Sequence, residues 1–263
     1  GFQGKRGKLT EEFFNKIIEI EPTFFLMENV ESLWKIKKQR RAFVKILKPV
    51  TEKYSIVKNI LNAIEYGVPQ NRNRLFVVGI NKKYIKNIEF ELMNNFYWPD
   101  KKFDNAVKKF SWPKIDEYKG SPKQPKDIPR QLYVDSYLVQ EKKNNVKNCD
   151  EIFKTYSEKF NTIEEGDTNR QSFKRLHRYR YSPTACYGNN EVHLHPYLPR
   201  RLSVREALRI QGVPDTYELP SIIGEGKRHL GLSAKFKMIS NGVPIPLAKT
   251  IAMALREFLV KNL

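Results

Sequence analysis

A short run of large apolar residues, positions 24–27, directly precedes an acid, Glu28. The run follows Pro22 and a helical pattern, and an apolar segment of this length predicts a buried parallel strand. Glu28 would lie at its carboxyl end, where the strands of open α/β sheets form the ligand crevice. Glu28 is therefore a candidate functional acid, although hydrated acids at strand ends are also common.

Segments around this run alternate between helical and strand patterns. Apolar residues recur at a helical period over residues 9–20 and again over residues 32–47, where Pro49 would end the helix. Residues 54–57 and 75–80 are two further strand candidates. This alternation predicts an α/β fold, namely the latter part of a doubly wound sheet.

The periodic pattern fades over residues 81–169, where prolines interrupt the chain repeatedly and only residues 148–159 suggest a longer helix. We therefore expect a small, irregular, β-containing second domain. The predicted division is residues 1–90, residues 91–234, and residues 235–263 returning to the first domain.

Two later segments carry clear helix boundary signals. Ser203 and Glu206 form a capping-box pattern, and Gly212 ends the helix that they begin. Residues 240–246 predict a tight turn before a final apolar helix over residues 247–259.

The charge balance of the chain bears on the kind of partner that it binds. Lysine and arginine number 48 against 29 aspartates and glutamates, which gives a net charge of +19. Charge of one sign on this scale repels itself and is usually tolerated where it meets a polyanion, most commonly nucleic acid. Some of these lysines would be plain solvated surface, so charge favours a nucleic-acid partner without identifying it.

Composition also excludes several classes of protein. No stretch approaches the length of a membrane span, and the first residues carry no apolar secretion segment, so we expect a cytoplasmic protein. Two cysteines and four histidines, without a Cys-x-x-Cys pair, predict neither a disulfide framework nor a metal site.

Two groups of arginines are candidates for phosphate or base contacts. Arg72 and Arg74 precede a strand candidate, and strand alternation would point both guanidinium groups to one side. A hydrated arginine pair is the alternative. Residues 169–181 interleave basic and aromatic residues without an acid, which favours nucleic-acid contact over a solvated run. The basic residues of this run are Arg170, Lys174, Arg175, Arg178 and Arg180.

Four segments, taken in order, resemble motifs of the cytosine-C5 DNA methyltransferases. Residues 27–30 resemble the Glu-Asn-Val motif of that family, and residues 67–74 are similar to its Gln-x-Arg-x-Arg motif. Residues 201–215 resemble the helix that supports the target-recognition domain, and residues 241–244 resemble the closing cofactor-side motif. The resemblance spans nearly the whole chain.

The resemblance implies methyl transfer from S-adenosylmethionine to C5 of a cytosine flipped out of a specific duplex sequence, in a restriction-modification system. In that family a cysteine adds to C6 of the base while an acid, here Glu28, hydrogen-bonds or protonates N3. Burial of Glu28 would favour its transient protonation. Arg74 would hold the cytosine O2, and Arg72 would brace the nucleophile loop or a phosphate. Asn241 and Val243 would bind the cofactor, Asn241 on its methionine side.

The chain departs from the family pattern in one respect. The Gly-rich cofactor loop and the Pro-Cys nucleophile of the family belong upstream of the Glu28 strand, and neither Cys149 nor Cys186 lies where the nucleophile belongs. The resemblance therefore implies the rear part of a Rossmann-like methyltransferase sheet, with an unpaired apolar edge. Such a chain would be inactive alone and completed by a complementary N-terminal piece or subunit.

Two alternatives remain at this point. The chain could be a non-catalytic, basic DNA-binding protein that retains the recognition module. It could also be a tRNA methyltransferase of the same lineage, which we favour less because the long insert suits readout of a duplex.

Overall fold

The computed structural model describes residues 5–85, 96–139, 146–187, 192–223 and 228–262, which divide into two compact units. The expected boundary near residue 90 lies at residue 100, and the expected return near residue 235 lies at residue 250. Unit 1 comprises Gly1–Asn62, Asn73–Asp100 and Thr250–Leu263, and unit 2 comprises Ala63–Arg72 and Lys101–Lys249.

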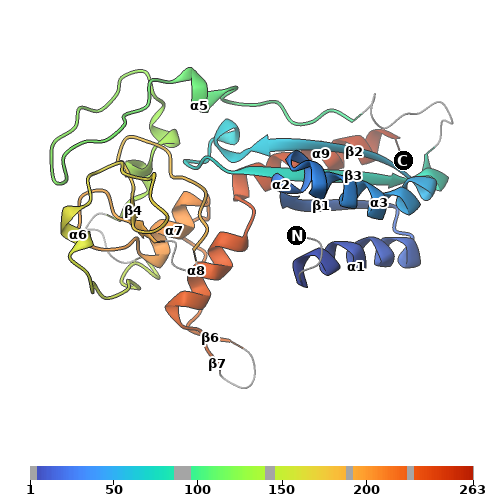
Figure 1. Cartoon of the computed structure of the whole chain (residues 1–263). Coiled ribbons are helices and arrows are strands. Elements are labelled where there is room, and N and C mark those ends of the chain that lie inside the picture. The colour runs from blue at the N-terminus through green and yellow to red at the C-terminus, as the bar shows by residue number, and fades with distance from the viewer. Residues whose placement is uncertain (1–4, 86–95, 140–145, 188–191, 224–227, 263) are drawn as a thin grey trace. The chain divides into compact units, whose positions relative to one another are not determined.

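Unit 1 contains a three-stranded sheet in the order β1–β3–β2 (Figure 1). The strands are β1 (Phe24–Val30), β2 (Tyr54–Asn62) and β3 (Asn73–Asn81), and β3 is antiparallel to both neighbours. The prediction of three strands is confirmed. The expectation that β1 pairs in parallel is wrong for its described neighbour β3. The connection from β2 to β3 is too short for a parallel crossover, so β3 runs opposite to β2, and it lies between β2 and β1, antiparallel to both.

One face of this sheet is covered by helices from the N-terminal part of the chain. These are α1 (Lys5–Ile20), α2 (Ser32–Lys35) and α3 (Lys37–Lys53). Their apolar sides enclose a core with alternate residues of the strands. The buried members of this core include Phe14, Phe25, Met27, Phe43, Leu47, Val50, Tyr54, Leu75 and Val77.

The second helix of the prediction differs from the observed one in two ways. It is divided at Ile36, whose backbone is extended, and it continues past Pro49 to Lys53. Pro49 was expected to end the helix, because proline removes a backbone donor. The fully buried Val50 lies in the next position and packs in the core, which keeps the last turn helical.

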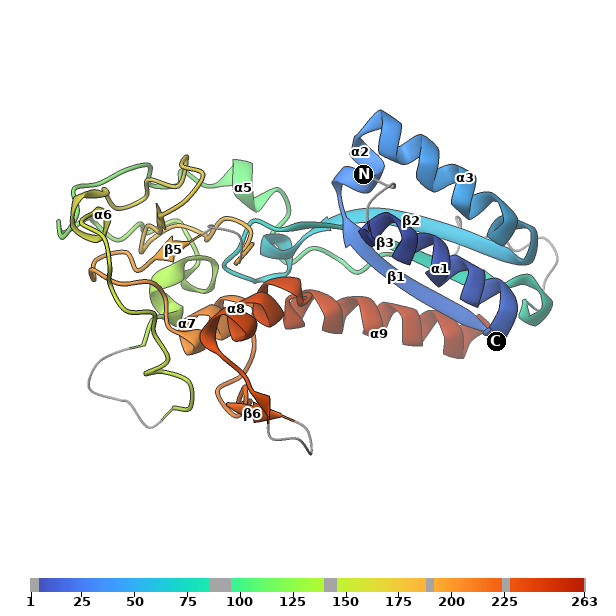
Figure 2. The same cartoon turned by 60° about the horizontal axis from the view of Figure 1, so that its bottom comes forward.

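The opposite face is covered by the last helix, α9 (Ile245–Asn262) (Figure 2). Leu255 and Phe258 of α9 pack against Val57, Val78 and Ile80 of the two strands β2 and β3. The predicted final helix is confirmed and is longer than expected. Among the described residues, none of the helices combines the length and the apolarity that crossing a membrane requires.

Strand β1 lies at the edge of the described sheet, because β3 is its only partner there. Three of its apolar side chains, Phe24, Leu26 and Val30, are 41%, 38% and 47% exposed. Alternate residues Phe25 and Met27 are buried. The expected apolar sheet edge is therefore present in the part of the chain that the structure describes.

Unit 2 is largely irregular, as expected for this stretch. Its longer helices are α7 (Val204–Ile210) and α8 (Leu232–Asn241), and the second was not predicted. The short elements are α5 (Ala106–Lys109), α6 (Lys159–Thr162), β4 (Lys174–Arg175) paired with β5 (His193–Leu194), and β6 (Ile222–Ile223) paired with β7 (Arg228–His229).

The helix predicted over residues 148–159 is wrong, because helical structure begins only at Lys159. Asn148 has a φ of +65°, which an α-helix does not accommodate. Its side chain exchanges two hydrogen bonds with the backbone of Leu219, at 2.9 and 3.0 Å. These contacts hold Asn148 in a conformation that is not helical.

Candidate active site

Glu28 and Arg74 lie on neighbouring strands and form an ion pair. In the β1–β3 register Glu28 faces Phe76 and Val30 faces Arg74, so both charged side chains project from the same face of the sheet. Arg74 Nε lies 2.9 Å from Glu28 Oε1. The prediction that these two residues converge is confirmed.

The pair is accessible rather than enclosed in the described chain. The Glu28 side chain is 29% exposed and the Arg74 side chain 12%. Burial of Glu28, which was expected to favour its protonation next to a bound base, is only partial in the described chain, where β1 is an edge strand. The arrangement offers a positioned carboxylate and a planar guanidinium side by side, which suits recognition of adjacent acceptor and donor atoms on a planar ligand.

Arg72 has a different environment from Arg74. Its side chain is 1% exposed, and its guanidinium donates to the carbonyls of Ala185, Ser240 and Gly242 at 3.1, 2.7 and 3.1 Å. A guanidinium buried in this way cannot contact a DNA phosphate. The phosphate contact expected for Arg72 is therefore wrong, because the buried charge is bound by carbonyl oxygens instead of water or phosphate. The other expectation, that Arg72 braces the nucleophile loop, stays a prediction.

The expected cofactor residues lie at the end of α8. Asn241 is the last residue of α8 and is exposed, and Val243 is half-buried. An exposed carboxamide both donates and accepts hydrogen bonds, as the amino and carboxylate groups of a methionine moiety require. The turn therefore fits one side of an S-adenosylmethionine site.

The basic run over residues 169–181 includes a buried structural arginine. Arg175 is fully buried, and its guanidinium lies 4.0 Å from the ring centroid of Tyr118. It donates to the carbonyls of Phe160, Ile163, His195 and Leu198 at 2.5 to 3.2 Å. The expectation that Arg175 contacts DNA is wrong, because all of its nitrogens bond to carbonyls inside unit 2.

Arg178 is also bound within unit 2. Its Nη2 lies 2.6 Å from Oε2 of the fully buried Glu165 and 3.1 Å from the carbonyl of Gly120. Arg178 therefore neutralises a buried acid, which leaves the exposed Arg170 and the partly exposed Lys174 and Arg180 as the DNA candidates of this run. Arg170 forms an ion pair with Asp167 at 3.1 Å.

The capping box of α7 is confirmed and forms part of a larger polar cluster. Ser203 Oγ accepts from the Glu206 N–H at 3.2 Å, and the Ser203 N–H donates to Glu206 Oε2 at 2.7 Å. Both guanidinium ends of Arg200 bind Glu206, at 2.7 and 2.8 Å. Although burial opposes it, this pairing keeps the pKa of Glu206 below its usual value. Burial lowers the pKa of the adjacent His195 to about 3, so this imidazole is neutral near pH 7.

A residue that the sequence reasoning missed is Gln70, the first residue of the Gln-x-Arg-x-Arg motif. It is fully buried, and its Oε1 accepts from the Ala185 N–H at 3.2 Å. The same segment pairs with Ser182 in a parallel bridge. The motif was the signal that could have identified Gln70. A buried glutamine needs hydrogen-bond partners for its amide, so a glutamine in this motif indicates a bonded structural position.

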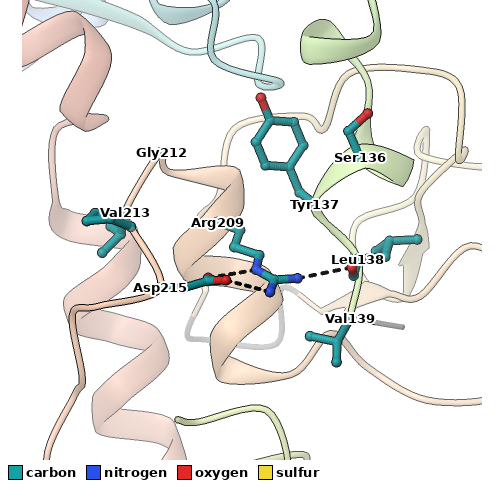
Figure 3. Close-up of a pocket in the computed structure, with 9 residues that line it drawn as sticks. Ser136, Tyr137, Leu138, Val139, Arg209, Gly212, Val213 and Asp215 are labelled. Carbon is teal, nitrogen blue, oxygen red and sulfur yellow. Dashed lines mark hydrogen bonds and ion pairs between the residues drawn. The ribbon is translucent and has the colours of Figure 1, made fainter. Parts of the chain in front are cut away.

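A pocket of about 480 Å³ lies beside the end of α7, lined by residues 136–139, Arg209 and residues 212–215 (Figure 3). The guanidinium of Arg209 projects toward it, bound by both oxygens of Asp215 at 2.8 Å and to the Leu138 carbonyl at 3.1 Å. The ion pair with Arg209 lowers the pKa of Asp215. Arg209 and Asp215 therefore neutralise each other, and the pocket presents little net charge to a ligand.

The chain resembles known methyltransferases over most of its length. It is 40% identical to the type II methyltransferase M.NmeDI of Neisseria meningitidis serogroup C, across 98% of this chain and 60% of that protein. It is 29% identical to the type II methyltransferase M.FnuDI of Fusobacterium nucleatum, across 98% of this chain and 72% of that protein. The chain thus spans less than two thirds of the length of the first of these relatives.

Solved structures and a family profile give a consistent result. An Escherichia coli structure, described as a DNA modification methyltransferase encoded within a prophage, shares 24% identity and a TM-score of 0.63, across 97% of this chain and 75% of that chain. That likeness concerns the α/β fold alone. Residues 1–257 match the profile of the family described as C-5 cytosine-specific DNA methylase, and this match over nearly the whole chain shows that the protein belongs to that family.

Proposed function

We propose that this chain is the rear part of a restriction-modification DNA (cytosine-5-)-methyltransferase, which methylates C5 of a cytosine flipped out of a specific duplex sequence. The observation that carries the proposal is the Glu28–Arg74 pair, on adjacent strands and one face of the sheet. Enzymes that modify a base in duplex DNA must extrude it, and the extruded base is recognised through its hydrogen-bonding edge.

In the proposed mechanism, the protonated carboxyl of Glu28 donates to N3 of the cytosine, and Arg74 donates to O2. A guanidinium carries five N–H donors, so Arg74 can keep its bond to Glu28 and still donate to a carbonyl oxygen. The bond between them fixes the direction of the carboxylate before the base arrives. A preorganised group of this kind loses little energy to reorganisation during the reaction.

Asn241 and Val243 would hold S-adenosylmethionine, with Asn241 on its methionine side. The bound cofactor supplies the methyl group. The contribution of this chain is to bind and orient one side of the cofactor through the exposed carboxamide at the end of α8. A cytoplasmic location, with the protein held on nucleoid DNA, belongs to the same proposal.

The net charge of +19 supports duplex DNA as the partner, and we assign Arg170, Lys174 and Arg180 to phosphate contacts. We expect Arg170→Ala combined with Arg180→Ala to weaken duplex binding. The slope of log affinity against log salt should fall by about 0.9 for each phosphate contact removed. The measurement is fluorescence anisotropy of a labelled duplex over a series of salt concentrations.

A matched control for that measurement replaces two exposed lysines of α3, Lys45 and Lys48, with alanine and so removes the same charge. The control should leave the slope nearly unchanged. Equal effects of the two double variants would show that only overall charge acts, and an unchanged slope for the arginine variant would place the DNA elsewhere.

The exposed edge of β1 supports the proposal that a complementary N-terminal piece completes a Rossmann-like sheet. A bare apolar edge exposes unpaired backbone groups and seldom persists without a partner. The piece would supply the Gly-rich loop and the Pro-Cys nucleophile that the resemblance implies. The chain alone is then expected to be inactive.

Adding this piece should raise the melting temperature of the chain and produce S-adenosylmethionine binding. A native-state partner at one hundred times its dissociation constant stabilises by about 2.7 kcal/mol. Leu26→Asp on β1 should weaken association, whereas Val44→Asp, on α3 and similarly exposed, should not. The measurements are a thermal melt and a cofactor titration, each with and without the piece.

Two outcomes would contradict this proposal. A stable monomer that binds the cofactor unaided would show that no piece is required. A chain that associates with the piece and binds DNA but never methylates it would favour a non-catalytic DNA-binding protein derived from such an enzyme.

A further inference from the structure

Arg72 lies where three segments of unit 2, far apart in sequence, come together. The backbone around Gln70 runs alongside Ser182, with the Asn71 N–H donating to the Ser182 carbonyl at 2.9 Å and the Ser182 N–H donating to the Pro69 carbonyl at 2.8 Å. The Thr184 hydroxyl donates to the Asn71 carbonyl at 2.8 Å. The backbone that precedes Arg72 is therefore held in place by these hydrogen bonds.

From this position the guanidinium reaches the end of α8. Its Nη2 donates to the carbonyls of Ser240 and Gly242, at 2.7 and 3.1 Å, and these two residues flank Asn241. The last carbonyls of a helix have no partner within the helix and carry partial negative charge. A buried cation that binds them caps the helix and fixes the path of the chain as it leaves.

The same turn is supported from its other side by the end of α7. Gln211 Nε2 donates to the Ile239 carbonyl at 2.9 Å, and the Ile245 N–H donates to the Gln211 carbonyl at 3.0 Å. Gly212 has a φ of +73°, and a Cβ there would lie 2.4 Å from Pro246 Cδ. The turn is thus held between α7 and Arg72, while Asn241 itself stays exposed.

We propose that Arg72 is a positioning residue for the cofactor-side turn, because it holds the carbonyls on both sides of Asn241 and so sets the direction of the Asn241 side chain. It acts on cofactor affinity and not on the base or on DNA phosphates. The assignment of the cofactor as the ligand of Asn241 rests on the proposed function. The statement that Arg72 supports the turn does not.

The first test measures hydrogen exchange in the chain itself, without cofactor. The Gly242 N–H donates to the Ile239 carbonyl at 3.2 Å and reports on the turn. In Arg72→Lys a single ammonium replaces the planar fork, and exchange at Gly242 should become at least tenfold faster, as the loss of one charge-assisted hydrogen bond predicts. The Ala207 N–H of α7 should be unaffected.

Controls keep this test decisive. Arg170→Lys, a matched change at an exposed arginine, should not alter exchange at Gly242. Arg72→Met removes the cation altogether and should accelerate exchange further. If exchange at Gly242 is unchanged in both Arg72 variants, Arg72 does not hold the turn.

The second test separates positioning from a purely structural role, in the complete gene product or the chain joined by its N-terminal piece. Arg72→Lys should raise the KM for S-adenosylmethionine about tenfold, with kcat within about twofold and affinity for duplex DNA unchanged. A faster-exchanging turn with unchanged cofactor KM would overturn the positioning role and leave the methyltransferase assignment intact. A wild-type complex that binds no cofactor would overturn the proposed function and the ligand assigned to Asn241, while exchange at Gly242 would still decide whether Arg72 holds the turn.

Discussion

In the complete enzyme, replacing Glu28 with glutamine is expected to slow methyl transfer by about a hundredfold or more, the usual contribution of a positioned acid. Glutamine keeps the shape of the side chain and accepts a hydrogen bond from Arg74, but it cannot supply a proton or a negative charge to N3. Binding of duplex DNA should be preserved, because Glu28 makes no proposed contact with phosphates. Single-turnover methylation and a parallel DNA titration give the two quantities.

Glu31→Gln is the matched control for this experiment. Glu31 follows β1, and its partner is Lys35, at 2.5 Å, one turn along the adjoining helix. The control should methylate at nearly the wild-type rate. A Glu28→Gln enzyme with an unchanged single-turnover rate would remove Glu28 from the catalytic groups.

Replacing Arg175 with methionine is expected to destabilise unit 2 by about 3 kcal/mol or more, because buried carbonyls that lose a charged donor cost about 1 to 3 kcal/mol each. Methionine keeps much of the apolar stem but donates no hydrogen bond to Phe160, Ile163 or His195. Urea unfolding measures the change as a lower midpoint.

Arg180→Met is the matched control, since Arg180 lies in the same run and is partly exposed. Surface substitutions usually change stability by less than about 0.5 kcal/mol. The pair also decides between two roles for the run. A stable Arg175→Met protein with weakened DNA binding would restore the role expected from sequence and would contradict the buried position of this arginine.

Arg175 and Arg180 have different environments, and the local sequence does not predict this difference. Both belong to one basic and aromatic run, and local pattern assigns them the same role. Their difference comes from residues far along the chain, since the acceptors of Arg175 include the carbonyls of His195 and Leu198. Burial of a charge depends on such tertiary partners, which local sequence does not display.

Features that depend on residues close together in sequence were predicted correctly. The capping box of Ser203 and Glu206 involves residues three apart, and it was predicted and confirmed. Helix α8 was missed because Lys235, only 1% exposed, interrupts its apolar side, and its charge is paired with Glu151 at 2.6 Å. The strand Phe24–Val30 was predicted, but its antiparallel neighbour was not, because pairing direction follows from chain connections beyond the strand itself.

The convergence of Glu28 and Arg74 was predictable for a further reason. Both residues directly adjoin strands that the apolar pattern identifies, and an acid and an arginine on adjacent strands can pair across one face. The two arginines of the Gln-x-Arg-x-Arg segment were expected to point to the same side. Arg74 belongs to unit 1 and pairs with Glu28, whereas Arg72 belongs to unit 2 and is bound there by backbone carbonyls.

The bonds of Arg72 also bear on when this protein can fold during its synthesis. Its carbonyl partners at Ser240 and Gly242 are 168 and 170 residues further along the chain. At ribosomal rates of about 5 to 20 residues per second, roughly 8 to 34 s separate translation of Arg72 from translation of these partners. Throughout that interval the guanidinium must stay hydrated, so the interior of unit 2 closes only after most of the polypeptide has been made.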